Sequence, residues 1–297
     1  MATQPLAQRL PLVVITGPTA SGKTSLAIKL AKKFNGEIIC ADSRTIYRGM
    51  DIGTAKPTRD ERRSVAHWGL DLVNPGDVFT AADFKNYAEQ KIEEIRSRGR
   101  MPLLVGGTGL YIDSVIFDFQ FGRTPDPDFR SRLENMSINQ LRYYCKEHNI
   151  VPPENDKNKR YLVRAIEQNN SSKKRRKQPT KNTIVVGIAT SINTLRSRID
   201  DRAEQLFANG VVEEATMLGK KYGWESEAMT GNVYPLVNEF LRNRLDKAEL
   251  MNKVALSDWH LAKRQMTWLR RNEYLLWADL ESAEQYITAQ LADESLV

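Results

Sequence analysis

The sequence predicts an α/β fold in which a parallel sheet is flanked by helices and carries a helical insertion domain. Short apolar segments of the kind that fills a buried parallel strand alternate with segments of helical periodicity. Glycine-rich turns follow several of the apolar segments directly. A basic stretch without strand rhythm interrupts this alternation, and it predicts the insertion.

The first two strands and the helix between them are predicted from the N-terminal residues. The apolar segment 12–15 predicts a buried strand, and apolar residues at helical spacing predict a helix over 25–34. Gly36 suits the end of that helix. A second strand is expected over 37–41, which places Asp42 at its carboxyl end.

The next helix and strand repeat this unit. Residues 81–98 form an amphipathic pattern, with Thr80 or Asp83 available as the N-cap. A third strand is expected over 102–105, and it runs into the Gly-Gly-Thr-Gly turn at 106–109. Strand–helix units in succession imply right-handed crossovers, and ligands of such folds bind at the carboxyl ends of the strands.

The insertion holds the excess positive charge. Residues 123–181 contain 15 Lys and Arg against 7 Asp and Glu, an excess of 8, whereas the whole chain has a net charge of +7. The run Lys173–Lys177 near the end of this stretch is typical of a solvated loop and of a phosphate-binding segment alike. We therefore expect a core of residues 1–121 and 183–297, with a basic helical insertion at 122–182.

Strand character returns after the insertion. Residues 183–189 predict a fourth buried strand. Helices are then expected over 195–208, 211–221 and 247–277, and they complete the core.

Composition limits the class of protein. The chain of 297 residues has a pI near 9.3, which favours a polyanionic partner. Its two cysteines and three histidines are scattered, so no disulfide framework, zinc site or His-based triad is expected. The N-terminus lacks the pattern of a signal peptide, and no apolar run is long enough to cross a bilayer. A cytoplasmic globular protein, monomeric by default, is expected.

The strongest chemical signal is the sequence GPTASGKT at 17–24, which matches the phosphate-binding P-loop pattern. It stands between a predicted strand and a predicted helix, where backbone N–H groups and the helix N-terminus converge on phosphate oxygens. Lys23 would neutralise phosphate charge, and the Thr24 hydroxyl would hold Mg²⁺. The core is therefore expected to be P-loop NTPase-like, with a di- or triphosphate as its ligand.

Two further polar clusters follow strand ends. Asp42 could hold Mg²⁺ through water, act as a general base beside a bound phosphate, or cap a helix. Thr108 supplies a hydroxyl to the same crevice, although a plain tight turn would have the same sequence. The polar loop 51–57 has no evident packing role, and its sequence fits a substrate loop and a surface loop equally well.

Cations also gather in two segments nearer the C-terminus. Residues 262–271 place four cations around Trp268, which is more typical of a core anchor than of a base-stacking residue. The basic side of that segment fits a phosphate contact and a solvated helix face alike. Arg198 and Arg202 lie four residues apart on one face of a predicted helix, where they could clamp phosphates.

Together, five segments resemble the tRNA dimethylallyltransferase family, whose members are also called tRNA isopentenyltransferases. They are GPTASGKT at 17–24, ADSRTIYRGMDIGTAKP at 41–57, AADF at 81–84, LLVGGTGLY at 103–111 and LAKRQMTWLR at 261–270. The segments follow the family's order across nearly the whole chain, and their combination is far more specific than the P-loop alone.

This resemblance implies an activity. The family transfers a dimethylallyl group from dimethylallyl diphosphate to N6 of the adenosine immediately 3′ of the anticodon, in tRNAs that read codons starting with U. Its P-loop serves the prenyl diphosphate, with Mg²⁺, in place of nucleotide hydrolysis. The chemistry agrees, because a loop adenine must be flipped out to react and the developing diphosphate charge must be stabilised.

The resemblance also assigns roles to residues. Asp42 would be the general base, with Thr108 at the adenine and reaction channel and with Lys23 and Arg198 assisting. The diphosphate would lie on the P-loop, formed by Gly17, Pro18, Thr19, Ala20, Ser21, Gly22, Lys23 and Thr24, the last of which would also hold the metal. The tRNA contacts would come from the core and the insertion: Asp42, Ser43, Arg44, Thr45, Thr108, Arg130, Lys159, Arg160, Lys263, Arg264 and Gln265.

Three positions depart from the family pattern. Thr45 stands where a glutamine is usual, so base recognition there is expected to differ. The family's Gly-Tyr element is not evident over 227–241, where residues 229–234 take its place. The sequence Asp-Trp-His at 258–260 replaces a usual Thr-Arg-Gln, which weakens the expectation of tRNA contacts on that turn.

Two other functions fit the P-loop alone. In a small-molecule kinase Asp42 would assist phosphoryl transfer to a hydroxyl, but the sequence has no Arg-rich lid pattern and its basic insertion exceeds what a metabolite needs. In a non-catalytic RNA-binding NTPase module Asp42 would serve only Mg²⁺. Protection against thermal unfolding by prenyl diphosphate or by ATP discriminates among these functions.

Overall fold

The chain divides into two compact units. The computed structural model describes residues 10–122, 126–169, 174–231 and 233–292. The larger unit consists of Met1–Phe117 and Gln178–Val297, and the smaller unit consists of Asp118–Lys177. The insertion was expected at 122–182, so the smaller unit begins and ends a few residues earlier than the composition suggested.

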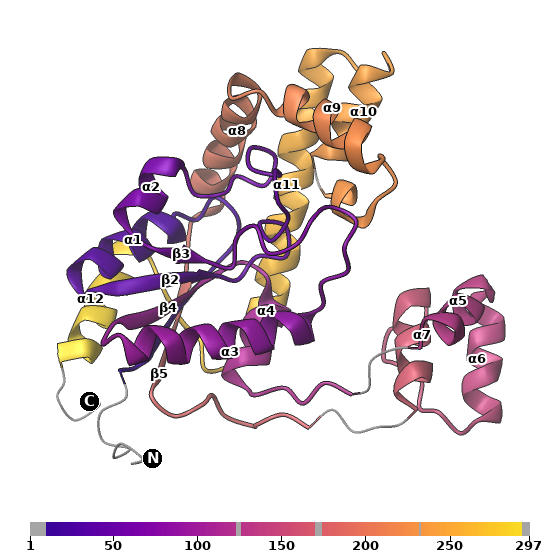
Figure 1. Cartoon of the computed structure of the whole chain (residues 1–297), viewed down its shortest axis with the longest axis horizontal. Coiled ribbons are helices and arrows are strands. Elements are labelled where there is room, and N and C mark those ends of the chain that lie inside the picture. The colour runs from indigo at the N-terminus through magenta and orange to yellow at the C-terminus, as the bar shows by residue number, and fades with distance from the viewer. Residues whose placement is uncertain (1–9, 123–125, 170–173, 232, 293–297) are drawn as a thin grey trace. The chain divides into compact units, whose positions relative to one another are not determined.

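A six-stranded, all-parallel sheet forms the centre of the larger unit (Figure 1). The strand order is β3-β2-β4-β1-β5-β6. The strands are β1 (Leu12–Thr16), β2 (Gly36–Cys40), β3 (His67–Trp68), β4 (Met101–Gly106), β5 (Thr183–Ile188) and β6 (Leu276–Ala278). The apolar segments predicted as strands are the four central ones, and they are buried almost throughout. Their carboxyl ends form one edge of the sheet, named here the carboxyl edge.

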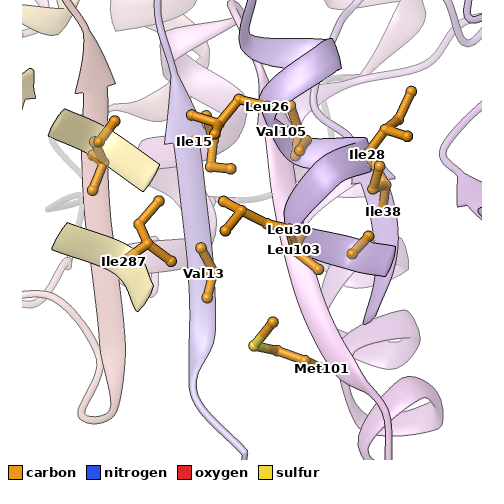
Figure 2. Packing of buried hydrophobic residues seen from close by; sticks show 14 of the residues in the cluster. Val13, Ile15, Leu26, Ile28, Leu30, Ile38, Met101, Leu103, Val105 and Ile287 are labelled. Atoms are coloured by element: carbon orange, nitrogen blue, oxygen red, sulfur yellow. The ribbon is translucent and has the colours of Figure 1, made fainter. Parts of the chain in front are cut away.

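Helices cover both faces of this sheet. On one face α1 (Lys23–Lys33) and α12 (Leu280–Ala292) pack on alternate strand residues such as Val13 and Ile15 (Figure 2). On the other face lie α3 (Ala81–Ser97) and α4 (Gly109–Ile116), which contact β4. The crossover through α1 leads outward to β2 and the crossover through α3 leads back, so right-handed connections put these two helices on opposite faces.

Local capping fixes the helix starts. Thr80 and Asp83 form a capping box at the start of α3, so the two residues predicted as alternative caps act together. Thr58 and Glu61 form the same motif before the short helix α2 (Arg59–Ser64). These caps satisfy backbone N–H groups that have no partner within the helix.

A second core lies among the helices that follow β5. They are α8 (Ile192–Ala208), α9 (Val211–Tyr222), the 3-10 helix η2 (Glu227–Thr230), α10 (Tyr234–Leu241) and α11 (Lys247–Leu269). Their buried residues pack on Ile46, Tyr47 and Met50, which belong to the segment after β2. This helical layer therefore lies against the carboxyl edge.

The helix expected over 247–277 is wrong in its last part. The helix α11 ends at Leu269, and Leu276 pairs with Val186 as part of β6. A three-residue edge strand is too short to carry a period, so its apolar residues merged with the helical pattern before them. The strand β3 has only two residues and was missed for the same reason.

The smaller unit is a three-helix cluster with its own core. Its helices are α5 (Pro127–Asn135), α6 (Ile138–Glu147) and α7 (Lys159–Gln168). The core consists of Leu133, Leu141, Cys145, Ile150, Leu162, Val163 and Ile166. Arg130 makes a bidentate ion pair with Glu167, at 2.7 and 2.9 Å, and joins α5 to α7. The unit is therefore held together by its own contacts.

Candidate functional site

The three polar turns predicted from the sequence meet at the carboxyl edge. The strand β4 lies between β1 and β2, so the turn after it adjoins both others. The Thr108 amide donates to the Ala41 carbonyl at 3.2 Å, and the Thr108 hydroxyl accepts a hydrogen bond from the Ser43 amide at 3.0 Å. A Cβ at Gly107 would lie 3.2 Å from the carbonyl oxygen of Gly17. The P-loop, the turn at 42–45 and the turn at 106–109 thus form one contiguous site.

The P-loop joins the end of β1 to the first residue of α1. Gly22 has a φ of +90°, a left-handed conformation that glycine adopts without steric cost, and it lets the helix begin at Lys23. The Thr16 hydroxyl donates to the Gly106 carbonyl at 2.9 Å and ties the start of the loop to β4. The loop amides and the N-terminus of α1 therefore form the kind of positive cradle that holds phosphate groups.

Lys23 is the charged residue of this cradle. Its ammonium group donates to the Pro18 carbonyl at 3.1 Å, across the loop. Burial lowers the pKa of Lys23 to about 8, with the Asp42 charge opposing that shift and the Arg202 charge adding to it. A bound polyanion would raise the pKa of Lys23 again, because nearby negative charge favours the protonated ammonium group.

Asp42 lies in a turn and not at the start of a helix. Its Oδ1 accepts a hydrogen bond from the Arg44 amide at 2.8 Å, and residues 43–46 form a turn. The helix-cap interpretation of Asp42 is therefore wrong. Arg44 in turn donates to the Glu227 carbonyl at 3.1 Å, whereas the neighbouring Thr45 is buried. The Asp42 side chain is partly accessible, as a group that meets a substrate must be.

The helix α11 contacts both the P-loop and the helix α4 that follows the turn at 106–109. Gln265 Oε1 accepts a hydrogen bond from the Thr19 amide at 2.8 Å, and Trp268 Nε1 donates to Asp113 Oδ2 at 2.7 Å. A Cβ at Gly109 would lie 2.0 Å from the Trp268 ring, so glycine is required there for α11 to approach. Trp268 is therefore partly buried and packs on the turn after β4, and it is not a member of the described hydrophobic cores.

The basic residues next to Gln265 differ from it. Lys263 and Arg264 are exposed, whereas the Gln265 side chain is half-buried and engaged with the P-loop. Sequence reasoning assigned all three to tRNA. The structure shows Gln265 bound to the P-loop through the Thr19 amide, a contact that a linear motif does not reveal because the two residues are 246 positions apart.

Of two arginines one turn apart on α8, Arg198 contacts the P-loop and Arg202 pairs with α11. Arg198 Nη1 donates to the Ser21 carbonyl at 3.1 Å, and Arg202 Nε donates to Asp258 Oδ2 at 3.1 Å. Arg198, expected to assist catalysis, therefore contacts the loop backbone itself. Arg202 received no role from the family resemblance, although its charge acts on Lys23.

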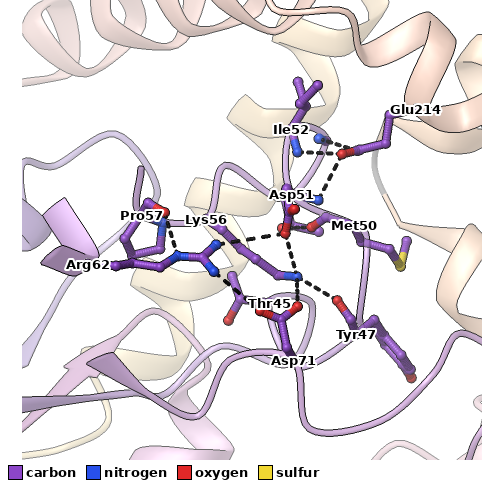
Figure 3. A network of polar contacts seen from close by, with 12 residues as sticks. Thr45, Tyr47, Met50, Asp51, Ile52, Lys56, Pro57, Arg62, Asp71 and Glu214 are labelled. Atoms are coloured by element: carbon purple, nitrogen blue, oxygen red, sulfur yellow. Dashed lines mark hydrogen bonds and ion pairs between the residues drawn. The ribbon is translucent and has the colours of Figure 1, made fainter. Parts of the chain in front are cut away.

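The loop 51–57 has a packing role that the sequence did not reveal (Figure 3). Glu214 of α9 accepts hydrogen bonds from three consecutive amides, those of Asp51, Ile52 and Gly53, at 2.7 to 2.9 Å. It also accepts one from the hydroxyl of Tyr234 at 2.9 Å. Burial and the Glu214 charge raise the pKa of the Tyr234 hydroxyl, so it stays protonated and remains a donor.

A buried lysine fixes the other end of this loop. The Lys56 ammonium donates to the Tyr47 carbonyl and to the carboxylates of Asp51 and Asp71, at 2.6 to 2.9 Å. Arg62 adds a contact of 3.3 Å to Asp71. The loop is therefore a built element beside the Asp42 turn. In the sequence Glu214 follows Glu213 in the first turn of a helix, and nothing there shows that it binds this loop.

The predicted contacts of the insertion lie within the smaller unit. Arg130 is engaged by Glu167, and the Lys159 ammonium donates to the Glu134 carbonyl at 2.5 Å. Arg160 is exposed at the N-terminus of α7. Of the basic run, residues 174–177 are exposed, and Lys173 lies outside the described residues.

Among the residues described, no three His, Cys, Asp or Glu side chains come together as a metal-binding group. Thr24 stands at the second position of α1, with its side chain partly accessible. Within the same residues, no helix combines the length and the apolar character that spanning a membrane requires.

A family model and the sequences of known proteins point to the same group of transferases. The family model described as IPP transferase matches residues 45–272. The tRNA dimethylallyltransferase of Roseiflexus sp. strain RS-1 is 37% identical over 93% of this chain and 96% of its own. That of Desulforudis audaxviator is 38% identical over 91% and 92%.

Solved structures show the same fold. The tRNA isopentenylpyrophosphate transferase from Bacillus halodurans superimposes with a TM-score of 0.73 at 33% identity, over 96% of this chain and 98% of its own. A eukaryotic dimethylallyltransferase, described as acting on tRNA, reaches a TM-score of 0.78 at 24% identity, over 95% of this chain and 77% of its own. At that lower identity the similarity concerns the fold alone.

Proposed function

The chain belongs to the IPP transferase family, and we propose that it transfers a dimethylallyl group from dimethylallyl diphosphate to N6 of the adenosine immediately 3′ of the anticodon in tRNA. One observation carries this proposal beyond the family match. The partly accessible carboxylate of Asp42 lies in the turn that Thr108 holds beside the P-loop. A base and a diphosphate cradle are thus combined at one edge of the sheet.

The reaction breaks one C–O bond and forms one C–N bond. The N6 amino group of the flipped adenine attacks C1 of the dimethylallyl group, and diphosphate leaves that carbon with the electron pair of the C–O bond. The proton lost from N6 goes to Asp42, whose Oδ1 already accepts the Arg44 amide and whose Oδ2 would take the proton. The amine of adenine is a weak nucleophile because its lone pair is delocalised, so proton removal assists bond formation.

The leaving group is held by the P-loop. Charge that develops on the diphosphate oxygens meets the amides of the loop, the N-terminus of α1 and the Lys23 ammonium group. Gln265 and Arg198 hold the loop through the Thr19 amide and the Ser21 carbonyl, which keeps these donors in place before substrate binds. Such preorganisation is usually the largest contribution to catalysis.

Mg²⁺ suits the donors at this site. A hard cation of this kind prefers oxygen ligands and keeps several waters, so the Thr24 hydroxyl and the diphosphate oxygens would hold it without a carboxylate cluster. When bound, the ion would neutralise part of the diphosphate charge.

The tRNA would be contacted by both units of a monomeric enzyme in the cytoplasm. From the larger unit we propose the Asp42–Thr45 turn, Thr108 and the exposed Lys263 and Arg264 of α11. From the smaller unit we propose Arg130, Lys159 and Arg160. A loop adenine is free to be splayed out and read on its edges, which a duplex base is not.

The test is transfer of radiolabelled dimethylallyl diphosphate to an unmodified anticodon stem-loop with three consecutive adenosines. We expect label on the adenosine 3′ of the anticodon, dependence on Mg²⁺, and no label after that adenosine is changed to guanosine. Hydrolysis of ATP without any labelled RNA would instead support a kinase or an NTPase.

The role of Asp42 is tested separately. We expect Asp42→Ala and Asp42→Asn to lower kcat by a factor of about 10² to 10⁴, the usual contribution of a general base, with nearly unchanged affinity for tRNA. Turnover close to that of the wild type in both variants would exclude Asp42 as the base.

A further inference from the structure

Asp258 is a buried carboxylate on α11 that no part of the mechanism above requires. Its residue is only 3% exposed, and its Oδ2 accepts a hydrogen bond from Arg202 Nε at 3.1 Å. A carboxylate removed from water in this way must be compensated by a cation or by hydrogen bonds. The Arg202 side chain supplies this compensation, and it remains 24% exposed.

The helices that carry this ion pair, α8 and α11, pack on each other. Leu195 and Ile199 of α8 pack on Ala262 of α11, and Ala20 at the tip of the P-loop and Trp259 join the same cluster. The helices α8 and α11 therefore meet beside the loop.

Helical spacing aligns the polar residues of this contact. Arg198 and Arg202 are one turn apart on α8, and Arg198 contacts the Ser21 carbonyl. Asp258 and Gln265 are two turns apart on one face of α11, and Gln265 contacts the Thr19 amide. One polar side chain of each helix therefore contacts the P-loop backbone. The other two, Arg202 and Asp258, join the helices to each other, one turn from Arg198 on α8 and two turns from Gln265 on α11.

We propose that Asp258 is a positioning residue: it holds the Arg202 guanidinium beside the P-loop, so that Arg202 contributes to binding of the diphosphate of the prenyl substrate. The Nε–carboxylate bond fixes the plane of the guanidinium, and the two terminal nitrogens still offer donors. Arg202 lies within electrostatic reach of Lys23. Two cations that repel each other are both stabilised by a diphosphate placed between them.

The inference rests on the proposed function, but inorganic diphosphate tests it without any transfer step. Binding of inorganic diphosphate is measured by calorimetry for the wild type, Asp258→Asn, Arg202→Ala and the double variant. Asparagine keeps the size of the side chain and removes its charge. We expect Asp258→Asn to weaken binding about tenfold, a typical effect of a charged hydrogen bond on the group it orients. In the Arg202→Ala background the same change should have no further effect.

A matched control separates positioning from simple loss of a buried ion pair. Glu37 is buried to a similar degree and pairs with Arg98 and Arg100, and Glu37→Gln should lower the melting temperature without altering diphosphate binding. An unchanged diphosphate affinity in Asp258→Asn, or an equal loss in both backgrounds, would refute the proposal. If Asp258→Asn does not fold, wild-type affinity in Arg202→Ala alone would refute it.

Measuring prenyl transfer on the same proteins separates a failure of this inference from a failure of the proposed function. A wild-type protein that labels tRNA while Asp258 and Arg202 act additively leaves the function intact and removes the inference. A wild-type protein that binds diphosphate but transfers no prenyl group removes the proposed function instead.

Discussion

Asp42, Glu37 and Glu214 are three carboxylates of the larger unit in very different surroundings. Glu214 is satisfied by three backbone amides and a tyrosine hydroxyl. Glu37 is 2% exposed and accepts hydrogen bonds from Trp68 Nε1 at 2.6 Å and from Arg98 Nη2 at 2.7 Å. Asp42 is the one of the three that is partly accessible, and its Oδ1 accepts a hydrogen bond from the Arg44 amide. The residue type is therefore not enough to single out the proposed general base, and the partners and exposure of each carboxylate are needed as well.

The Glu37 cluster predicts how stability depends on pH. Burial by itself raises the pKa of Glu37, but hydrogen bonds from Arg98 and Trp68 and the charges of Arg98 and Arg100 lower it below its ordinary value. A carboxylate with a lowered pKa stabilises the fold above its unfolded-state pKa, and that stabilisation is lost as the pH falls through the folded-state value.

Glu37→Gln should therefore lower the free energy of unfolding by about 2 kcal/mol at pH 7, allowing for the exposure of both arginines. The difference from the wild type should shrink as the pH falls below 4.5, where the unfolded-state carboxylate is protonated. Chemical denaturation measured from about pH 7 down to about pH 3.5 follows this difference, because the range starts well above the ordinary pKa of 4.5 and ends below it. A difference that is constant over this range would contradict the assignment.

Gln265 makes a prediction about the P-loop. Gln265→Leu removes the acceptor of the Thr19 amide, and Gln265→Glu keeps an acceptor but adds negative charge beside the diphosphate. We expect both to raise the KM for dimethylallyl diphosphate, by about tenfold for leucine and by more for glutamate, because repulsion is added to the lost preorganisation. Steady-state kinetics at saturating tRNA measure this. A glutamate variant that binds as well as the wild type would show that Gln265 lies outside the range of the diphosphate charge.

Among the helices and strands, the sequence predicted those whose formation depends on the local pattern of apolar residues. The four central strands and the helices α1 and α3 follow apolar periodicity, and they lie where it predicted. The strands β3 and β6 depend on pairing with a neighbour, so their short segments gave no signal. The loop 51–57 depends on Glu214 and Lys56, and its shape is set by contacts across more than 160 residues. Long-range polar contacts of this kind are absent from any local pattern.

The close contact between Trp268 of α11 and Gly109 in the turn after β4 leads to a separate prediction. A Cβ at Gly109 would lie 2.0 Å from the Trp268 ring, which Asp113 holds in place. We expect Gly109→Ala to destabilise the fold by about 2 kcal/mol, as overpacking of a core does, and to lower the transfer rate because Thr108 shifts with the turn.

Gly231→Ala is the matched control for this change. Its Cβ would meet neighbours only at 3.6 Å or more, which is ordinary contact, so thermal unfolding should be close to that of the wild type. Equal melting temperatures for the Gly109 and Gly231 variants would show that α11 moves aside freely.

For the whole molecule, the change in composition predicted that the chain divides into a core and an insertion. The smaller unit is separate because it has a hydrophobic core of its own. The smaller unit has its own hydrophobic cluster and its own ion pair between Arg130 and the buried Glu167. Its net charge was visible in the sequence, whereas the use of Arg130 as a tie between helices was not, since an arginine that binds RNA and one that binds a glutamate look alike in sequence. Residues 174–177 are all exposed, which leaves this basic segment open to a polyanion.

The last prediction concerns that segment. Changing Lys174, Arg175, Arg176 and Lys177 to glutamine should weaken tRNA binding and flatten its dependence on salt, because each lost phosphate contact reduces the slope of log K against log [salt] by about 0.7 to 0.9. Affinity for dimethylallyl diphosphate should stay unchanged, since its cradle is built by residues of the larger unit. Changing the exposed Lys32 and Lys33, at the end of α1 remote from the carboxyl edge, is the control for loss of charge as such. A salt slope that falls equally per charge in both variants would show that tRNA senses only the net charge of the protein; a fall confined to the 174–177 variant would identify a defined contact.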